Sequence, residues 1–354
     1  MKQKKRIYVE IALGVLFIFT AVFLTKPGDD SIWPKSRIAV DSGNRQVMGT
    51  IAKIIVVAMD EKIAKNAIEA AFRKIDSLED QMSVYKPDSM ISGLNENGFN
   101  EPVKVSEELF YVIQSSIEFS KKTDGAFDIT VGPLIELWKE AGKKNELPEP
   151  AQIEEAKKSI GYEKLILNPD ENTIQFAVEG MKIDLGAIAK GFAIDKAAEE
   201  IMKAGAIGGL IDIGGDIRCF GAPPKLKKNW MVGLQNPKNI QGNDAKQVLL
   251  TLSLFSNSVA TSGNYQRYVE IDGKRFSHII DPHKYSSADD LQSVSVIAAT
   301  SIDSDALATS VSVLGKERGL ELIESLADVE AVIIPAGADQ EMIMSSGMKD
   351  LLEK

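Results

Sequence analysis

Hydrophobic residues recur along the chain with two different spacings, and these predict a mixture of helices and strands. The run Thr50–Met59 is almost continuously apolar, which is typical of a buried β-strand. Apolar residues three and four positions apart predict helices over 60–82 and 106–121, with a loop over 85–98 between them. A third helix is predicted after a glycine turn within 184–206.

The later part of the chain is predicted to consist mostly of strands. Short strands are expected at 164–168 and 173–178, and the glycine-rich run 208–221 is typical of a strand with a Gly-Gly-Asp turn. From Trp230 onward, helical spacing returns only over 300–327, where Gly315 divides two segments. Because strands and helices do not alternate regularly, the pattern predicts an α+β fold with largely antiparallel sheets.

The N-terminal segment has a pattern of its own. A basic end, residues 1–6, precedes the apolar run Ile7–Leu24, which only Glu10 interrupts. At about 1.5 Å per residue this run is just long enough to cross a bilayer core. It is either a transmembrane anchor or a cleaved signal, and the absence of a small-residue cleavage site favours the anchor. The basic end is then cytoplasmic, and a polar tether (25–45) and the body (46–354) lie outside.

Charge and cysteine content exclude several classes of function. The chain has 51 acidic and 41 basic residues, and its net charge of −10 argues against nucleic acid as a ligand. Its single cysteine, Cys219, cannot form an internal disulfide, and no zinc-binding cysteine spacing is present. With only two histidines, His278 and His283, a histidine-rich metal site is excluded as well.

Two polar residues in the predicted helix over 300–315 suggest a metal site. Asp305 and Thr309 are four residues apart, so they share one face of that helix. Carboxylate and hydroxyl oxygens are hard ligands of the kind that Mg²⁺ prefers. A helix start or a solvated face would supply the same residue types, so both interpretations remain open at this point.

The glycine-rich stretch "DLGAIAKG", Asp184–Gly191, also has two interpretations. It is either a turn capped by Asp184 that leads into a helix, or a place where phosphate approaches a helix start. Free N–H groups and the helix dipole favour anions there. Lys190 would add a positive charge, although the stretch is not a P-loop.

Three further segments contain candidate side chains. In "DGAFDITVGPL", Phe127 and Asp128 form either a solvated turn or a site where an aromatic ring lies over a flavin or purine. In "HIIDP", His278 is three residues from Asp281 and is either structural or a general base near neutral pH. The stretch "DIGGDI", 212–217, is predicted to be only a tight turn between strands.

Together, and in this order, these segments closely resemble the ApbE family of FAD:protein FMN transferases. The resemblance extends from residue 48 to residue 315 and rests on "MGT", "MSVYKPDSMISGLN", "DGAFDITVGPL", "KIDLGAIAKGFAID", "DIGGDI", "VATSGNYQRY", "HIIDP" and "DSDALATSVSVLG". One departure is visible. After "HIIDP" the family usually has an Arg-Thr-Gly-like turn, whereas here "HKYSS" follows.

The resemblance implies an activity and its partners. Such enzymes use FAD as a substrate, transfer its FMN moiety to a threonine or serine hydroxyl of another exported protein, and release AMP. The reaction is a phosphoryl-type transfer in which Mg²⁺ neutralises the pyrophosphate and a base helps the nucleophile. The implied partner is an exported acceptor protein with a Ser-Gly-Ala-Thr-like run, which this chain itself lacks.

The resemblance also assigns residues to roles. It implies that Asp305, Thr309 and the Ala187 carbonyl bind Mg²⁺, and that His278 is the base for the acceptor hydroxyl. The residues that it places against FAD are Met48, Tyr85, Ala126, Phe127, Asp128, Asp184, Lys190, His278 and Ile279.

Other functions remain possible from the sequence. The same site residues would serve an FAD pyrophosphatase, in which water replaces the acceptor hydroxyl and FMN and AMP are released. A membrane-anchored flavoprotein that carries electrons is a second alternative, but a stably held flavin needs no Mg²⁺ ligands. An adaptor without activity is a third, and it would leave the site-like segments unexplained.

Overall fold

The computed structural model describes residues 33–224, 228–237, 248–264, 268–337 and 341–353. The predicted basic end and the predicted anchor over 7–24 lie outside these ranges, so both stay predictions. Within the described ranges, no helix is long and apolar enough to span a bilayer.

The centre of the molecule is a large antiparallel sheet. Within the described part of the chain it has eight strands, in the order β1-β2-β6-β7-β10-β15-β16-β17, and every neighbouring pair is antiparallel. The strands are β1 (Ile38–Val47), β2 (Thr50–Ala58), β6 (Gly208–Ile213), β7 (Asp216–Gly221), β10 (Ser258–Gly263), β15 (Leu291–Ala298), β16 (Glu330–Pro335) and β17 (Ile343–Met344). This arrangement confirms the α+β prediction with antiparallel pairing.

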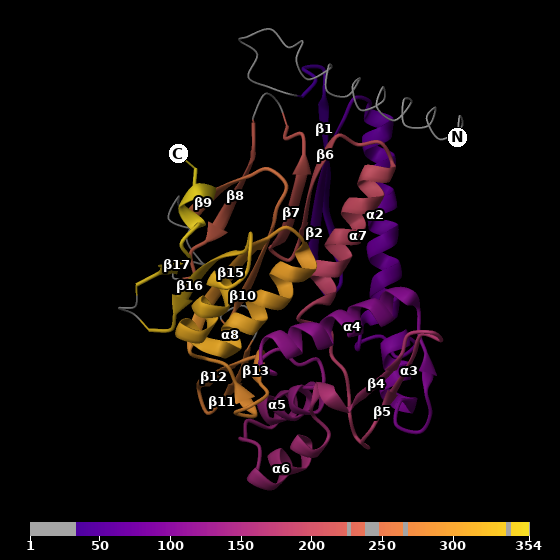
Figure 1. The fold of residues 1–354 in the computed structure, drawn as a ribbon, viewed down its shortest axis with the longest axis vertical. Helices are drawn as coiled ribbons and strands as arrows, with labels where there is room; N and C mark the ends of the chain where they lie inside the picture. Colours follow the sequence, from indigo (N-terminus) through magenta and orange to yellow (C-terminus); the bar gives the residue numbers. More distant parts are fainter. Residues whose placement is uncertain (1–32, 225–227, 238–247, 265–267, 338–340, 354) are drawn as a thin grey trace, which may run out of the picture.

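Three long helices pack against one face of this sheet (Figure 1). They are α2 (Glu61–Met82), α7 (Ala189–Lys203) and α8 (Ser301–Glu324). Their alanine-rich contact faces let the helices and the sheet approach closely; Ala64, Ala67, Ala197 and Ala198 are fully buried. The opposite face is covered by the hairpin of β8 (Trp230–Gln235) and β9 (Val248–Leu254), whose apolar side chains share a core with the sheet.

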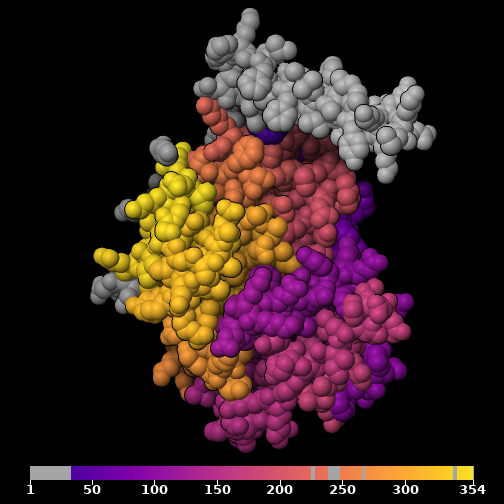
Figure 2. Space-filling model, viewed as in Figure 1, coloured from indigo at the N-terminus to yellow at the C-terminus, as the bar shows by residue number. Residues whose placement is uncertain are grey.

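A second layer lies beyond one end of the sheet and supplies one wall of the site (Figure 1). Its helices are α3 (Met90–Asn97), α4 (Glu107–Lys122), α5 (Gly132–Lys144), α6 (Pro150–Lys158) and the short 3₁₀ turn η1 (Tyr162–Lys164). Its strands are β3 (Val103–Lys104), β4 (Leu165–Asn168) and β5 (Thr173–Phe176), in the order β3-β5-β4. The space-filling view shows this layer against the C-terminal third of the chain (Figure 2).

The remaining elements are small. Two short hairpins are formed by β11 (Tyr268–Ile271) with β12 (Lys274–Ser277) and by β13 (Ile280–Asp281) with β14 (Ser286–Ser287). The 3₁₀ turn η3 (Met348–Leu351) packs Met348 into the core shared with β8 and β9.

The structure corrects the sequence expectations at two places and confirms them at a third. Residues 38–45, expected in the tether, belong to β1 and pair with β2. The expected loop over 85–98 contains α3, because Ser89 caps it and Ile91 and Leu94 are buried. The two helical segments expected over 300–327 are confirmed: they form the two parts of α8, which is kinked at Gly315, where φ is +79°. That left-handed value is one that glycine adopts without steric cost.

Candidate functional site

Two buried carboxylates face one ammonium group where α7, α8 and the β6–β7 hairpin meet. Asp305 from α8 and Asp216 from β7 are 4% and 2% exposed. Lys190, in the first turn of α7, forms an ion pair with Asp216, and its Nζ lies 3.4 Å from Oδ1 of Asp305. The backbone N–H of Thr261 donates to the other oxygen of Asp216 at 3.1 Å. We call Lys190, Asp216 and Asp305 the ionic centre.

The pKa values of Asp305 and Lys190 in this ionic centre are both raised, for different reasons. Burial raises the pKa of the Asp305 carboxyl to about 6, with Lys190 opposing the rise and Asp216 adding to it. Burial alone would lower the pKa of Lys190, but the attraction of Asp216 and Asp305 outweighs it, so the pKa is raised and Lys190 stays charged. When both carboxylates are ionised, the centre carries one more negative charge than positive charge.

Thr309 lies one helical turn beyond Asp305 on the same side of α8. Its Oγ1 is 3.4 Å from Oγ of Ser262, and the residue is half-buried. Ala187 is half-buried in the loop before α7, three residues from Lys190. The structure thus confirms that Asp305 and Thr309 share one face.

The donor types at this place fit a hard divalent cation. Across the described ranges, no cluster of three His, Cys, Asp or Glu side chains could hold a metal ion. A cation at Asp305 would therefore need neutral oxygens as well, and the Thr309 hydroxyl is one on the same face of the helix. The unbalanced negative charge of the ionic centre is a second feature that a cation would neutralise.

The loop that begins at Asp184 connects this centre to the second layer. Oδ1 of Asp184 accepts from the N–H of Gly186 at 2.8 Å, which fixes the turn. The N–H of Asp184 donates to the carbonyl of Ile129 at 2.8 Å. The segments "DGAFDITVGPL" and "DLGAIAKG" therefore lie side by side.

The larger cavity described lies between α3 and α5 and has a volume of about 560 Å³. Tyr85 and Asp184, both expected against FAD, line it. Tyr85 is 74% exposed; its hydroxyl is 2.8 Å from Nζ of Lys139, which also lies 4.8 Å from the ring centroid. The other lining residues are Val84, Ser92, Asn95, Glu96, Gly132, Ile135, Glu136, Lys182 and Ile183. An exposed aromatic ring at a cavity of this size can take a planar ligand.

Met48 occupies the tight turn between β1 and β2. It adopts φ +47°, and its N–H donates to Oε2 of Glu79 at 2.9 Å. Its half-buried side chain packs against the cores on both sides of the turn. The β1–β2 hairpin, and not a contact with the ionic centre, therefore sets the position of Met48.

Phe127 and Asp128 have structural contacts that the sequence does not reveal. The Phe127 ring is 1% exposed and packs on Phe119 with ring centroids 5.8 Å apart. It belongs to the core, which corrects the expectation that this ring lies over a flavin. The Asp128 carboxylate accepts from the N–H and hydroxyl of Thr130 and from the N–H of Tyr162. Burial outweighs these bonds and raises the pKa of Asp128.

Ala126 and Ile279, two of the residues expected against FAD, lie together in the fold. They form a small apolar cluster with Ala288 and Val313. Because Val313 is four residues beyond Thr309, one side of α8 runs from Asp305 through Thr309 to this cluster. The segment that contains His278 therefore approaches the same side of the helix as the ionic centre.

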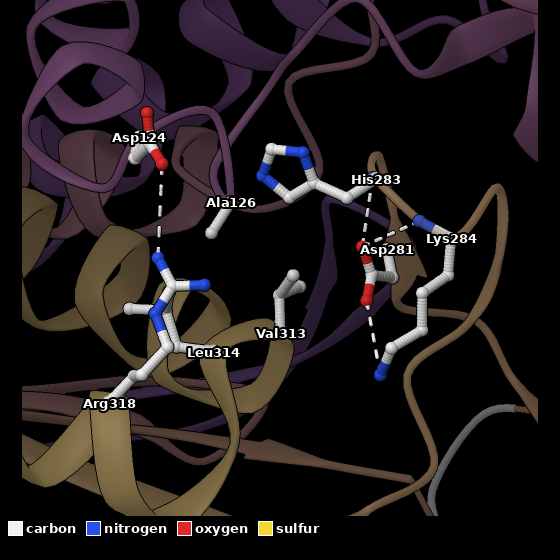
Figure 3. Close-up of a pocket in the computed structure, with 8 residues that line it drawn as sticks. All are labelled: Asp124, Ala126, Asp281, His283, Lys284, Val313, Leu314 and Arg318. Atoms are coloured by element: carbon white, nitrogen blue, oxygen red, sulfur yellow. Dashed lines mark hydrogen bonds and ion pairs between the residues drawn. The ribbon is translucent and has the colours of Figure 1, made fainter.

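A second cavity, of about 260 Å³, opens beside this cluster (Figure 3). Its floor is apolar and its rim is charged; the lining residues are Asp124, Ala126, Asp281, His283, Lys284, Val313, Leu314 and Arg318. Asp124 and Arg318 form an ion pair of 3.9 Å across one side of the rim.

His278 is exposed and lies between β12 and β13. Asp281, expected as a neighbouring carboxylate, caps the turn that follows: its Oδ1 accepts from the N–H groups of His283 and Lys284 at 2.8 and 3.1 Å. Tyr285 adopts φ +57° and donates its N–H to the Asp281 carbonyl. The "HKYSS" turn therefore obtains its geometry from Asp281, with a left-handed Tyr285.

Asp216 is a site residue that the reasoning from sequence missed. It is the fifth residue of the "DIGGDI" stretch, which predicts no more than a turn. Its burial and its ion pair with Lys190 follow from the β6–β7 hairpin, which places the first residue of β7 beside the start of α7. The signal in the sequence was a carboxylate directly after a Gly-Gly turn within a family-like segment.

Comparisons with known proteins agree on one family. A family model described as the ApbE family matches residues 48–333. The FAD:protein FMN transferase of Haemophilus influenzae is 34% identical over 76% of this chain and 77% of its own. That of Treponema pallidum is 31% identical over 91% of each chain.

Solved structures show the same likeness in three dimensions. The ApbE protein from Thermotoga maritima aligns with a TM-score of 0.78 and 30% identity, over 90% of this chain and 100% of that one. The flavin transferase ApbE from Vibrio cholerae aligns with a TM-score of 0.76 and 29% identity, again over 90% of this chain and 100% of that one.

Proposed function

Because the chain belongs to the ApbE family, we propose that it is an FAD:protein FMN transferase that moves FMN onto a threonine or serine hydroxyl and releases AMP. The observation that carries this proposal is the ionic centre, with Thr309 on the same helix face and the Ala126–Ile279 cluster one turn further. It combines a cation, buried carboxylates and a hydroxyl at one place, as the chemistry of a pyrophosphate requires.

The transfer exchanges one phosphorus–oxygen bond for another. The acceptor hydroxyl oxygen attacks the phosphorus on the riboflavin side of FAD. The bond from that phosphorus to the bridging oxygen breaks, and AMP leaves with that oxygen and its electron pair. The hydroxyl proton passes to a base, for which we propose the imidazole of His278. The product is FMN linked to the acceptor through a phosphoester.

Residues of the ionic centre have distinct roles in this proposal. Mg²⁺ bound by Asp305, Thr309 and the Ala187 carbonyl would supply positive charge to the pyrophosphate. Lys190 stays protonated because two carboxylates face it, so it adds a fixed positive charge. Asp216 holds the Lys190 ammonium group in place through their ion pair.

We place the FAD along the path from the larger cavity to the ionic centre. Tyr85 offers an exposed ring for the planar isoalloxazine. Met48 packs against the core to which α3 and α4 contribute. Asp184 lines the cavity and also starts the loop that leads to Lys190, so it joins the two parts of the site. Ala126 and Ile279 contribute apolar contacts, and Phe127 and Asp128 contribute through the backbone that their buried side chains hold in place.

The cellular setting is proposed from the sequence. We infer that Ile7–Leu24 anchors the protein in the cell membrane with residues 1–6 in the cytoplasm and the catalytic body outside. The acceptor is then an exported protein with a Ser-Gly-Ala-Thr-like run.

FAD hydrolysis is the second candidate. The exposure of His278 favours it, because water can reach an exposed imidazole as easily as a peptide hydroxyl can. In that case FMN and AMP would be released without any flavin on a protein. An electron carrier is disfavoured, because a protein that only holds a flavin for electron transfer would not need the buried charges of the ionic centre.

One experiment separates these functions. The full-length protein in detergent is incubated with FAD, Mg²⁺ and a peptide with a Ser-Gly-Ala-Thr run, and the peptide is examined by flavin fluorescence and mass. A fluorescent peptide that is heavier by FMN, with AMP released, supports the transferase. Free FMN and AMP with an unchanged peptide identify a hydrolase. Intact FAD after prolonged incubation would contradict both.

A further inference from the structure

Asp195, a residue of α7 that lines neither cavity, binds the start of α8. Its Oδ1 accepts from the N–H of Ser301 at 2.8 Å, and its Oδ2 accepts from the N–H groups of Ser301 and Ile302, both at 3.0 Å. Its Oδ1 also forms an ion pair with Arg218 of β7. Asp195 is only 9% exposed, and Ser301 and Ile302 are buried.

These bonds satisfy N–H groups that a helix cannot satisfy itself. The first N–H groups of an α-helix have no partner within the helix, and a carboxylate at that end also interacts favourably with the helix dipole. Because Ser301 and Ile302 are buried, water cannot replace Asp195 as their partner. Arg218 balances the charge of the carboxylate, which keeps Asp195 suitable as an acceptor.

A second contact lies one turn away on both helices. Gly191 is four residues before Asp195, and its N–H donates to Oδ2 of Asp305 at 2.9 Å. Asp305 is in turn four residues after Ser301. The two helices are therefore joined at two points, Asp195 to the start of α8 and Gly191 to Asp305 itself. At Gly191 a Cβ atom would overlap the carbonyl of Ser301, so the helices are as close as backbones allow.

We propose that Asp195 is a positioning residue that holds the first turn of α8 so that the Asp305 carboxylate and the Thr309 hydroxyl present their oxygens to one divalent cation. The inference rests on the proposed function, because the cation belongs to that site. Asp195 acts through the backbone of α8 and touches neither substrate nor metal. Asp195 acts on the site through its hydrogen bonds to the first turn of α8, and its ion pair with Arg218 ties that turn to the central sheet.

The test is direct cation binding by the full-length protein with Mn²⁺ as the probe, followed by electron paramagnetic resonance. Asp195→Asn keeps the shape of the side chain but replaces one acceptor oxygen with a donor. We expect its Mn²⁺ dissociation constant to rise about tenfold or more, as for residues that orient metal ligands in other proteins. The Mg²⁺ concentration for half-maximal FMN transfer should rise by the same factor, with turnover recovering at high Mg²⁺. The matched control is Glu199→Gln, which changes a half-buried carboxylate of the same helix that is paired with Lys196 rather than bonded to the first turn of α8.

A variant that loses stability away from the site separates a positioning role of Asp195 from a purely structural one. Trp230→Phe removes a buried indole hydrogen bond to Gly221 in the β8–β9 layer and should lower the melting temperature. Trp230→Phe should leave the Mn²⁺ dissociation constant unchanged. Asp195→Asn should raise that constant even when it is measured well below the melting temperature of the variant. Arg218→Gln provides a second variant in case Asp195→Asn does not fold. Its effect on Mn²⁺ binding should be in the same direction, and the effects in the double variant should not add.

The outcomes distinguish this inference from the proposed function. Wild-type protein that binds Mn²⁺, with unchanged affinity in folded Asp195→Asn or Arg218→Gln, would overturn the positioning role and leave the metal site in place. Wild-type protein that binds no Mn²⁺, or binds it equally well after Asp305→Asn, would overturn the metal site and the positioning role together. Weakened binding in Trp230→Phe to the same extent would show that lost stability explains the effect.

Discussion

The N–H of Gly191 donates a 2.9 Å hydrogen bond to the carboxylate of Asp305, so the backbone of α7 contacts a side chain of the ionic centre on α8 directly. Gly191 precedes the turn of α7 that contains Asp195, and Asp305 belongs to the ionic centre. The packing of the two helices and the orientation of the Asp305 carboxylate therefore depend on the same hydrogen bond. A change at either residue should affect stability and activity together.

Gly191→Ala tests this contact. The added Cβ would overlap the backbone of Ser301, which can move only if the two helices separate. We expect a loss of about 1–3 kcal/mol in the free energy of unfolding, as for overpacked cores, measured by denaturant titration, together with strongly reduced FMN transfer. Gly93→Ala is the matched control, because the helical Gly93 has no atom near its Cβ position. Equal stability of Gly191→Ala and the wild type would contradict the close packing.

Asp305→Ala tests the proposed metal site. The variant loses the charged ligand, so FMN transfer should fall to background at ordinary Mg²⁺ while binding of the flavin ring at Tyr85 largely remains. Thr309→Val loses one neutral oxygen, so its defect should be milder and partly rescued by excess Mg²⁺. EDTA should have the same effect on the wild type as Asp305→Ala has.

The measurement for this prediction is transfer to an acceptor peptide at a series of Mg²⁺ concentrations, with FAD binding for each variant. Glu317→Gln, an exposed carboxylate later in α8, is the control and should resemble the wild type. Activity that survives both Asp305→Ala and EDTA would eliminate the metal assignment.

Lys190→Met should make stability depend strongly on pH. Burial raises the pKa of Asp305, and Lys190 opposes that rise, so the variant should raise the pKa further. A carboxyl whose folded pKa exceeds its unfolded value binds more protons when folded, so the free energy of unfolding falls as pH rises through that interval. In the wild type this interval runs from about 4 to about 6. In the variant it should extend to higher pH.

Denaturant unfolding at several pH values between 4 and 8 measures this prediction. Lys203→Met is a suitable control, since its ion pair with Glu200 is exposed on the same helix. The same pH dependence in Lys190→Met and the wild type would show that Asp216 and Asp305 are not coupled through the lysine.

The sequence predicted elements well where amphipathic spacing extends over several turns. The helix expected over 60–82 is α2, because its buried residues follow the helical repeat without interruption. The short α3 was mistaken for a loop, because Pro87 and Gly93 flank or interrupt it and only Ile91 and Leu94 are buried. A short helix has too few apolar positions for its period to be recognised.

The sequence predicted individual residues of the candidate site but not the contacts between segments that are distant in sequence. Asp305 and Thr309 could be paired from their spacing, because a helix alone places them together. The contact of Lys190 with Asp216 and Asp305 joins three segments distant in sequence, so only the assembled fold shows it. Phe127 was misjudged for the same reason: whether an aromatic residue faces a ligand or the core depends on what packs against it, here Phe119.

The predicted anchor is tested by fractionation. If Ile7–Leu24 spans the membrane uncleaved, the full-length protein should remain in the membrane fraction after a high-salt wash, because burial of an apolar span does not depend on ionic strength. Detergent should release it. N-terminal sequencing of the mature protein checks the same point, and a mature N-terminus beyond Leu24 would identify a cleaved signal without affecting the proposed activity.

His278 and His283 together test the proposed base. Both are exposed and lie in the same loop region, but only His283 belongs to the turn capped by Asp281. If His278 accepts the proton of the acceptor hydroxyl, His278→Ala should keep FAD binding and lose about 10²–10⁴-fold in transfer rate. His283→Ala should have a much smaller effect. Rates are measured as flavin fluorescence on the acceptor peptide, and FAD binding is measured separately for each variant. Equal rates in His278→Ala and the wild type would make His278 a structural residue, and a loss confined to His283→Ala would move the base to the second histidine.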